Sequence, residues 1–134
     1  MFSTLDVLTS GMTAQRARLN VAADNYANIE STRDAFGNVN PYKPKRAVFQ
    51  TGLPEKGMPN QGVRVSEIKE FPAFKMSHIP NHPDADENGN VKFPDIDPLF
   101  EFVDAIEAAR AYEMNATAFE VTKQLFSTTI RLLA

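Results

Sequence analysis

Apolar residues recur at alternating spacings of three and four at both ends of the chain. Near the N-terminus the pattern covers eight positions, seven of them apolar: Leu5, Leu8, Met12, Gln15, Leu19, Ala22, Tyr26 and Ile29. Near the C-terminus it covers ten positions, nine of them apolar: Phe102, Ala105, Ala109, Tyr112, Ala116, Phe119, Lys123, Phe126, Ile130 and Leu133. We call these sets the N-terminal stripe and the C-terminal stripe. A narrow stripe at this spacing is typical of helices that pair as in a coiled coil.

Each of these two helices needs a partner along its whole length, because a single apolar stripe cannot be buried by one helix alone. The residues between them are too few, and too rich in proline and glycine, to supply that surface. We therefore expect the two helices to pair with each other and then with neighbouring copies. This arrangement indicates assembly rather than catalysis.

The middle of the chain has a different composition. All nine prolines and five of the six glycines lie between Glu30 and Pro98. Alternating apolar residues begin at Gly62 and slip out of phase at Ile68, which is compatible with a bulge or a strand end. We expect an α+β fold. Its paired terminal helices span residues 1–30 and 98–134, with Pro98 at a helix start, and a small β-rich region spans residues 31–97.

Charge and composition exclude several classes of protein. The net charge of −3 disfavours nucleic acid as the main partner, because phosphate binding needs a basic surface. The chain has no cysteine, so it forms neither a disulfide nor a thiolate metal site. No stretch reaches the roughly 18 apolar residues of a membrane span, so no direct membrane insertion is expected. The N-terminus also lacks the features of an ordinary cleaved signal.

An acidic turn in the middle region matches the calcium-loop pattern in part. Asp84, Asp86 and Asn88 stand at the first, third and fifth positions, and Asp95 stands at the twelfth. Lys92 occupies the ninth position, where an oxygen ligand or water is expected. The flanking prolines exclude the two helices of an EF-hand. The favoured interpretation is a polar turn, and a soluble calcium-binding module that uses the Asp84–Asp95 loop is the alternative function.

Candidate catalytic residues are few. His78 and His82 are the only histidines, and Pro80 between them makes a helical metal-binding pair improbable. The sequence contains no nucleophile elbow, P-loop or dinucleotide-binding glycine motif. We therefore expect no enzymatic activity, no cofactor and no metal site.

Two asparagines stand at the end of the N-terminal helix, where asparagine is a poor interior residue. Asn25 and Asn28 either occupy the exit from the helix without a specific role or donate and accept hydrogen bonds with the backbone of a neighbouring loop or subunit. The residues alone leave both alternatives open.

These asparagines also carry a family resemblance. The segment Leu19–Asn28 resembles the N-terminal signature of the flagellar rod and hook family, in which a helix ends in N-x-A-N. The segment Asn81–Asp97 and the Tyr42–Phe49 strand are similar to that family's middle region. Near the C-terminus, Arg110–Asn115 is similar to the family's R-x-Y-x-x-N motif. The resemblance covers nearly the whole chain in the right order.

The resemblance implies a structural subunit of the proximal rod of the bacterial flagellar basal body, which spans the periplasm. Such subunits leave the cell through the flagellum's own export channel. The expected partners are further copies of the chain and neighbouring rod proteins, namely proximal and distal rod subunits and the adaptor at the rod base. The expected assembly-interface residues are Leu5, Leu8, Met12, Leu19, Asn25, Tyr26, Asn28, Ile29, Tyr112, Asn115, Phe119, Phe126, Ile130 and Leu133.

Overall fold

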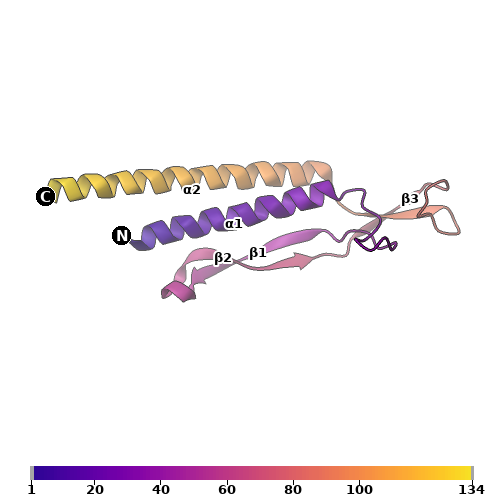
Figure 1. The fold of residues 1–134 in the computed structure, drawn as a ribbon, viewed down its shortest axis with the longest axis horizontal. Helices are drawn as coiled ribbons and strands as arrows, with labels where there is room; N and C mark the ends of the chain where they lie inside the picture. The colour runs from indigo at the N-terminus through magenta and orange to yellow at the C-terminus, as the bar shows by residue number, and fades with distance from the viewer. Residues whose placement is uncertain (1, 134) are drawn as a thin grey trace.

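The computed structural model describes residues 2–133, so residues 1 and 134 of the predicted helical domain lie outside the described residues. It is an α+β fold, as predicted. Helix α1 spans Phe2–Ala27, and α2 spans Pro98–Leu133. Between them lie strand β1 (Lys45–Leu53), a short 3-10 turn η1 (Pro54–Lys56) and strands β2 (Met58–Glu70), β3 (Phe74–His78) and β4 (Asn90–Pro94). The molecule is long and thin, with both termini toward one end (Figure 1).

The two helices begin and end at residues suited to those positions. The Nδ2 group of Asn28 donates to the carbonyl of Asp24 at 2.8 Å, which satisfies one of the last carbonyls of α1. At the start of α2, the Oδ1 atom of Asp97 accepts a hydrogen bond from the backbone of Leu99 at 2.9 Å. Pro98 occupies the first helical position, where its missing N–H costs nothing. Local sequence therefore sets both boundaries of the middle region.

Small residues let the two helices lie side by side, antiparallel (Figure 1). Ala14 and Ala22 of α1 and Ala108 of α2 are buried, with at most 1% of each exposed. A Cβ atom added to Gly11 would lie 3.0 Å from Nδ2 of Asn115, so glycine allows the close approach. In its first half α2 therefore approaches α1 closely at Ala108 and Asn115, which lie outside the C-terminal stripe, while Ala105 and Ala109 of the stripe are half-buried. A stripe of period 3.5 drifts by about 20° per heptad around a straight helix of period 3.6.

The first hairpin, β1–β2, packs against α1. Val48 pairs with Glu67 and Phe49 with Val65, so Ser66 is an extra residue on β2. This bulge lies where the alternation slips before Ile68, and the phase slip is confirmed as a bulge. At the other end of the strand, the Oγ atom of Ser10 on α1 accepts a hydrogen bond from the backbone of Val63 at 3.1 Å. Strand β2 includes Pro59 near its start, a position where a strand tolerates proline.

Replacing Gly62 by Ala is expected to loosen this hairpin from α1. Gly62 has a φ of +79°, and a Cβ atom there would lie 2.7 Å from Cδ1 of Leu53 and 2.9 Å from Oγ of Ser10. Backbone strain and the clash together should lower the free energy of unfolding by about 2 kcal/mol. Gly57→Ala is the matched control, because Gly57 also has a positive φ, +70°, with nothing within 4 Å. Urea unfolding should show the larger loss for Gly62→Ala; equal losses would contradict the packing argument.

The second hairpin, β3–β4, forms the end of the molecule opposite the termini (Figure 1). Its five paired positions run from Phe74 with Pro94 to His78 with Asn90. Val91 and Pro94 are its most buried side chains, each less than 2% exposed. This small core holds the acidic turn between the two strands in place.

Candidate assembly interface

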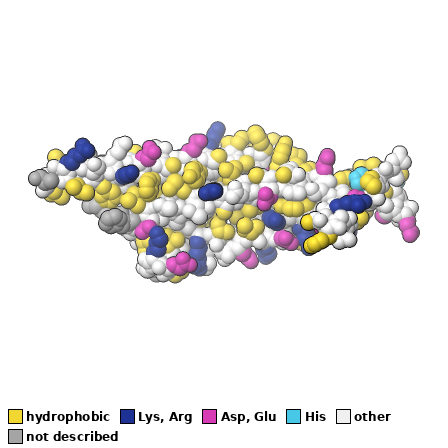
Figure 2. Space-filling view, in the orientation of Figure 1, with side chains coloured by type: hydrophobic (Ala, Val, Ile, Leu, Met, Phe, Trp, Pro, Cys, Tyr) yellow, Lys and Arg dark blue, Asp and Glu magenta, His cyan; other side chains and the backbone are white. Residues whose placement is uncertain are grey.

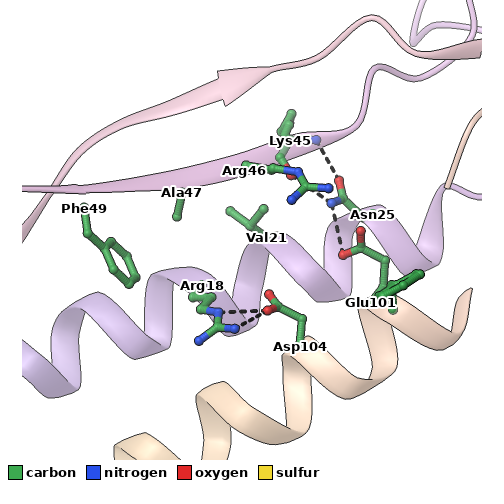
Figure 3. A pocket seen from close by; sticks show the side chains of 10 residues that line it. Arg18, Val21, Asn25, Lys45, Arg46, Ala47, Phe49, Glu101 and Asp104 are labelled. Atoms are coloured by element: carbon green, nitrogen blue, oxygen red, sulfur yellow. Dashed lines mark hydrogen bonds and ion pairs between the residues drawn. The ribbon is translucent and has the colours of Figure 1, made fainter. Parts of the chain in front are cut away.

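Asn25 joins three parts of the fold. Its side chain is 2% exposed and lies between α1, β1 and α2. The Nδ2 group donates to the carbonyl of Lys45 at 2.9 Å and to the Glu101 carboxylate at 3.1 Å. The Oδ1 atom accepts from the backbone N–H of Lys45 at 2.9 Å (Figure 3). It also accepts from the Tyr42 hydroxyl at 3.1 Å. Of the two alternatives for Asn25, bonding to neighbouring backbone is the one observed, and that backbone belongs to the same chain.

Burial changes the acid–base properties of the groups around Asn25. It raises the pKa of Tyr42 to about 12, with further contributions from the negative charges of Asp24, Glu101 and Glu70. Tyr42 therefore remains a neutral hydrogen-bond donor over the physiological range. Burial also raises the pKa of Glu101, against the hydrogen bond from Asn25, which lowers it.

An ion-pair cluster links the two helices beside this network. The Nε group of Arg18 donates to Asp104 at 2.9 Å, and its Nη2 group contacts both Asp104 and Glu107. The hydrogen bond to Asp104 is the main cause of the raised pKa of Arg18. Because these side chains are 31–61% exposed, the cluster contributes orientation rather than much stability.

An open groove of about 590 Å³ lies in front of this region (Figure 3). Helix α1 forms its floor, β1 forms one wall and the start of α2 forms the other. Figure 3 shows Arg46 extending from β1 toward Asn25, and Phe49 pointing from β1 toward α1. The groove is lined by Arg18, Val21, Asn25, Lys45, Arg46, Ala47, Phe49, Phe100, Glu101 and Asp104. We call it the α1–β1–α2 groove.

The structure places the predicted interface residues in three environments. Asn25 alone is buried. The half-buried ones are Leu5, Leu8, Met12, Leu19, Asn28, Ile29, Asn115, Phe119 and Phe126. The exposed ones are Tyr26, Tyr112, Ile130 and Leu133, at 53%, 40%, 66% and 84%. Burial within one chain therefore covers the stripes only in part, and their contact with neighbouring subunits stays a prediction.

A second apolar stripe on α2 was missed by the sequence analysis. Its ten positions follow spacings of four, three and four: Leu99, Val103, Ile106, Arg110, Met114, Thr117, Val121, Leu125, Thr128 and Leu132. All ten are exposed, and seven are apolar. A repeat of eleven residues, about 3.67 per turn, stays on one side of a straight helix. Figure 2 shows apolar side chains spread over the helical part of the surface. This outer stripe could have been found by testing the eleven-residue period.

Comparison with known proteins identifies the family. Residues 5–33 match the family "Flagella basal body rod protein", and residues 87–132 match "Flagellar basal body rod FlgEFG protein C-terminal". The flagellar basal-body rod protein FlgC of Aquifex aeolicus is 41% identical over 96% of this chain and 94% of its own length. The FlgC proteins of Borreliella burgdorferi and Salmonella typhimurium are each 35% identical, over 99% and 98% of this chain and 97% of their own lengths. The chain belongs to the FlgC family.

Membership of the FlgC family makes this chain a structural subunit of the flagellar basal-body rod. Within residues 2–133, neither helix has a stretch long and apolar enough to cross a membrane. The same residues contain no group of three or more His, Cys, Asp or Glu side chains placed to hold a metal ion.

In this FlgC-family chain the acidic turn is a structural brace. The Asp84 side chain is only 3% exposed. Its carboxylate accepts hydrogen bonds from Oγ1 of Thr32 at 2.6 Å and from Nε of Arg33 at 2.8 Å. Asp86 instead accepts from the backbone of Asn88 and Asn90 within its own turn. The carboxylates thus face different partners. The Asp84 contacts tie the segment after α1 to the turn between β3 and β4.

The histidines lie on either side of this turn without converging. Nδ1 of His82 accepts a hydrogen bond from the backbone N–H of Asp84 at 3.0 Å, and its ring stacks edge-on against Phe93 at 5.9 Å. Nδ1 of His78 instead lies 3.2 Å from Oδ1 of Asn90. Each histidine therefore stabilises its own segment of the hairpin.

Acid is expected to weaken the Asp84 brace. The hydrogen bonds from Arg33 and Thr32 hold the pKa of Asp84 below its usual value of 3.8. Since the folded pKa is depressed, the stabilisation is present above pH 4 and is lost as the pH falls through the folded pKa. Asp84→Asn should unfold at a lower temperature than the wild type at pH 7, and the two melting temperatures should converge as the pH falls through the lowered pKa of Asp84. Asp86→Asn is the control for a solvent-exposed turn carboxylate. A wild-type–variant difference that is independent of pH would contradict this account.

Proposed function

We propose that this chain is a subunit of the proximal rod that assembles through its terminal helices. Residues 1–30 and 98–134 would act as one assembly domain, and residues 31–97 as a smaller domain beside it. The single observation that carries this proposal is the outer stripe, in which seven of ten exposed positions between Leu99 and Leu132 of α2 are apolar. An apolar surface of this length is costly to leave in water and marks a protein contact.

The N-terminal stripe supports the same proposal from the other helix. Leu5, Leu8, Met12 and Leu19 are half-buried, so each keeps apolar surface available after α1 and α2 have paired. Apolar surface on both helices is expected of a subunit that is surrounded by copies of itself and by the other rod proteins proposed from the family resemblance. We also propose that the chain leaves the cell through the flagellar export channel and lies in the periplasmic part of the basal body.

The test is the composition of basal bodies from cells that carry an epitope-tagged form of this chain. Deleting its gene should abolish swimming and leave basal bodies that lack a rod. Re-expression should restore both, and the tagged chain should be detected in the rod fraction next to the base. Swimming cells in the deletion strain, or a tagged chain absent from purified basal bodies, would overturn the assignment.

A further inference from the structure

The turn between β3 and β4 is tied to the segment after α1 through one carboxylate. Among the helices and strands, β3 and β4 make their main contacts with each other. In the part of the chain that the structure describes, the side-chain hydrogen bonds between residues 28–42 and residues 79–89 all go to Asp84. They come from Thr32 at 2.6 Å and from Arg33 at 2.8 Å. The Asp84 brace therefore sets how the second hairpin is held against the segment after α1.

His82 holds the same turn in a form that requires a neutral ring. Its Nδ1 atom accepts a hydrogen bond from the backbone N–H of Asp84 at 3.0 Å. A ring nitrogen that accepts a hydrogen bond carries no proton, so the neutral ring has its proton on Nε2. A further proton must enter at Nδ1, where it would face the N–H that Nδ1 now binds. Protonation of His82 therefore breaks this hydrogen bond.

The charged group that faces His82 is Asp84. Its Oδ2 atom lies 4.0 Å from Nδ1, and the Asp84 and His82 side chains are 3% and 27% exposed. From β4 the ring meets Phe93, which carries no charge. From the segment after α1, Arg33 reaches the Asp84 carboxylate, and His82 has no other ion pair within residues 2–133. A protonated Nδ1 would thus have a carboxylate oxygen within reach.

Protonation of His82 makes the ring a competitor for the Asp84 carboxylate. An imidazolium–carboxylate hydrogen bond is about twice as strong as a neutral one, with its heavy atoms about 2.8 Å apart. From 4.0 Å, the ring and the carboxylate must approach each other by about 1 Å. The carboxylate already holds Thr32 and Arg33 at 2.6 and 2.8 Å, so its movement toward His82 lengthens those bonds.

We propose that His82 is a proton switch that moves the Asp84 carboxylate between two sets of partners. With a neutral ring, Asp84 braces Thr32 and Arg33. With a protonated ring, Asp84 turns toward His82, and the tie between the segment after α1 and the β3–β4 turn loosens. Imidazole ordinarily gains its proton between about pH 5 and 8. The switch belongs to the single chain, so it goes beyond the proposed function and does not depend on assembly.

The carboxylate stays charged while the switch operates. The hydrogen bond from Arg33, followed by the one from Thr32, holds the pKa of Asp84 below its usual value of 3.8. In mild acid the charge of Asp84 therefore still stabilises the fold, but through His82 instead of through the segment after α1. Loosening of the brace in mild acid is thus separate from the loss of the Asp84 charge at lower pH.

An NMR titration of the purified chain from about pH 8 to about pH 5 tests the switch. At the upper end, the ring nitrogen signals of His82 should show the Nε2–H form, and at the lower end the doubly protonated ring. The Thr32 methyl and Arg33 Nε–H signals should shift with the same midpoint as the ring. Hydrogen exchange of the Asp84 amide, corrected for pH, should become about fivefold faster, because the amide loses its acceptor.

His82→Asn is the variant that keeps the acceptor without the titration. Asparagine accepts a backbone N–H two residues on, as in an Asx turn, so it can replace Nδ1 as the partner of the Asp84 amide. The Thr32 and Arg33 signals should then stay constant over the whole pH range. His78→Asn is the matched control, because His78 is the other histidine and its ring lies against β4. This control should leave the transition unchanged.

Two results would overturn the inference. Thr32 and Arg33 signals that stay constant while the His82 ring gains its proton would show that Asp84 keeps its partners. A transition that persists in His82→Asn would assign it to another group. The wild-type titration decides the first point even if His82→Asn fails to fold. Because every measurement uses the isolated chain, absence of the chain from basal bodies would overturn only the proposed function.

Discussion

Replacing Asn25 by Ala is expected to lower the free energy of unfolding by about 3 kcal/mol, because a buried backbone N–H and C=O lose their partners at once. Both groups belong to Lys45, and the Tyr42 hydroxyl and the Glu101 carboxylate lose a bond as well. For a chain of this size the loss corresponds to a melting temperature about 10 °C lower. Circular dichroism melts of the purified protein measure it.

Two further variants test whether the loss of stability comes from the hydrogen bonds of Asn25. Asn28→Ala removes only bonds within the exit of α1, to Asp24 and Ser31, and should cost less than about 1 kcal/mol. Asn25→Asp keeps the acceptor for Lys45 and Tyr42 but places a second carboxylate beside Glu101, so it should be more stable in mild acid than at pH 8. An Asn25→Ala protein that melts with the wild type would show that the hairpin is held by other contacts.

Ile130→Asp is expected to abolish swimming although the monomer folds normally. Ile130 is 66% exposed, so the substitution should change the stability of the isolated chain by only about 0.5 kcal/mol. In an assembled rod the same carboxylate would be buried without a partner, at a cost of several kcal/mol. Soft-agar motility and the chain's abundance in cells are the measurements.

Leu19→Asp should also abolish swimming, but through both folding and assembly, because Leu19 is half-buried against its own chain. Asn20→Asp is the matched control, since Asn20 is the exposed neighbour on α1 and makes no side-chain hydrogen bond within residues 2–133. Cells with Asn20→Asp should swim. Motile cells that carry Ile130→Asp at normal abundance would show that the last turns of α2 are not part of the assembly interface.

Local pattern was sufficient to predict both helices and a β-rich middle region. Apolar spacing predicted both helices, and Pro98 predicted where the second begins. The slip at Ile68 was compatible with a bulge or a strand end, and the structure has a bulge at Ser66. Each of these features depends on residues a few positions apart, whose preferences act before any tertiary contact forms. The family motifs are also contiguous in sequence, which is why the rod family could be named from them.

The rotation of the helices depended on contacts that the stripes do not encode. Helix α1 packs against α2 on one side and against the β1–β2 hairpin on the other, so Ala14 and Val21 are buried although neither belongs to the N-terminal stripe. On α2, Ala108 is fully buried because small side chains let the helices approach closely. A sequence pattern treats each helix as having one partner, whereas α1 has two.

The sequence by itself determined two long terminal helices, a β-rich middle, exposed apolar surface and membership of a rod family. Only the tertiary structure decided which atoms Asn25 bonds, that Asp84 braces a loop 51 residues away, and that α2 extends beyond α1. It also formed the α1–β1–α2 groove, since that requires three elements distant in sequence. Periodicity arises from neighbours along the chain, whereas buried polar bonds and grooves arise from the relative placement of whole elements, which local preferences do not specify.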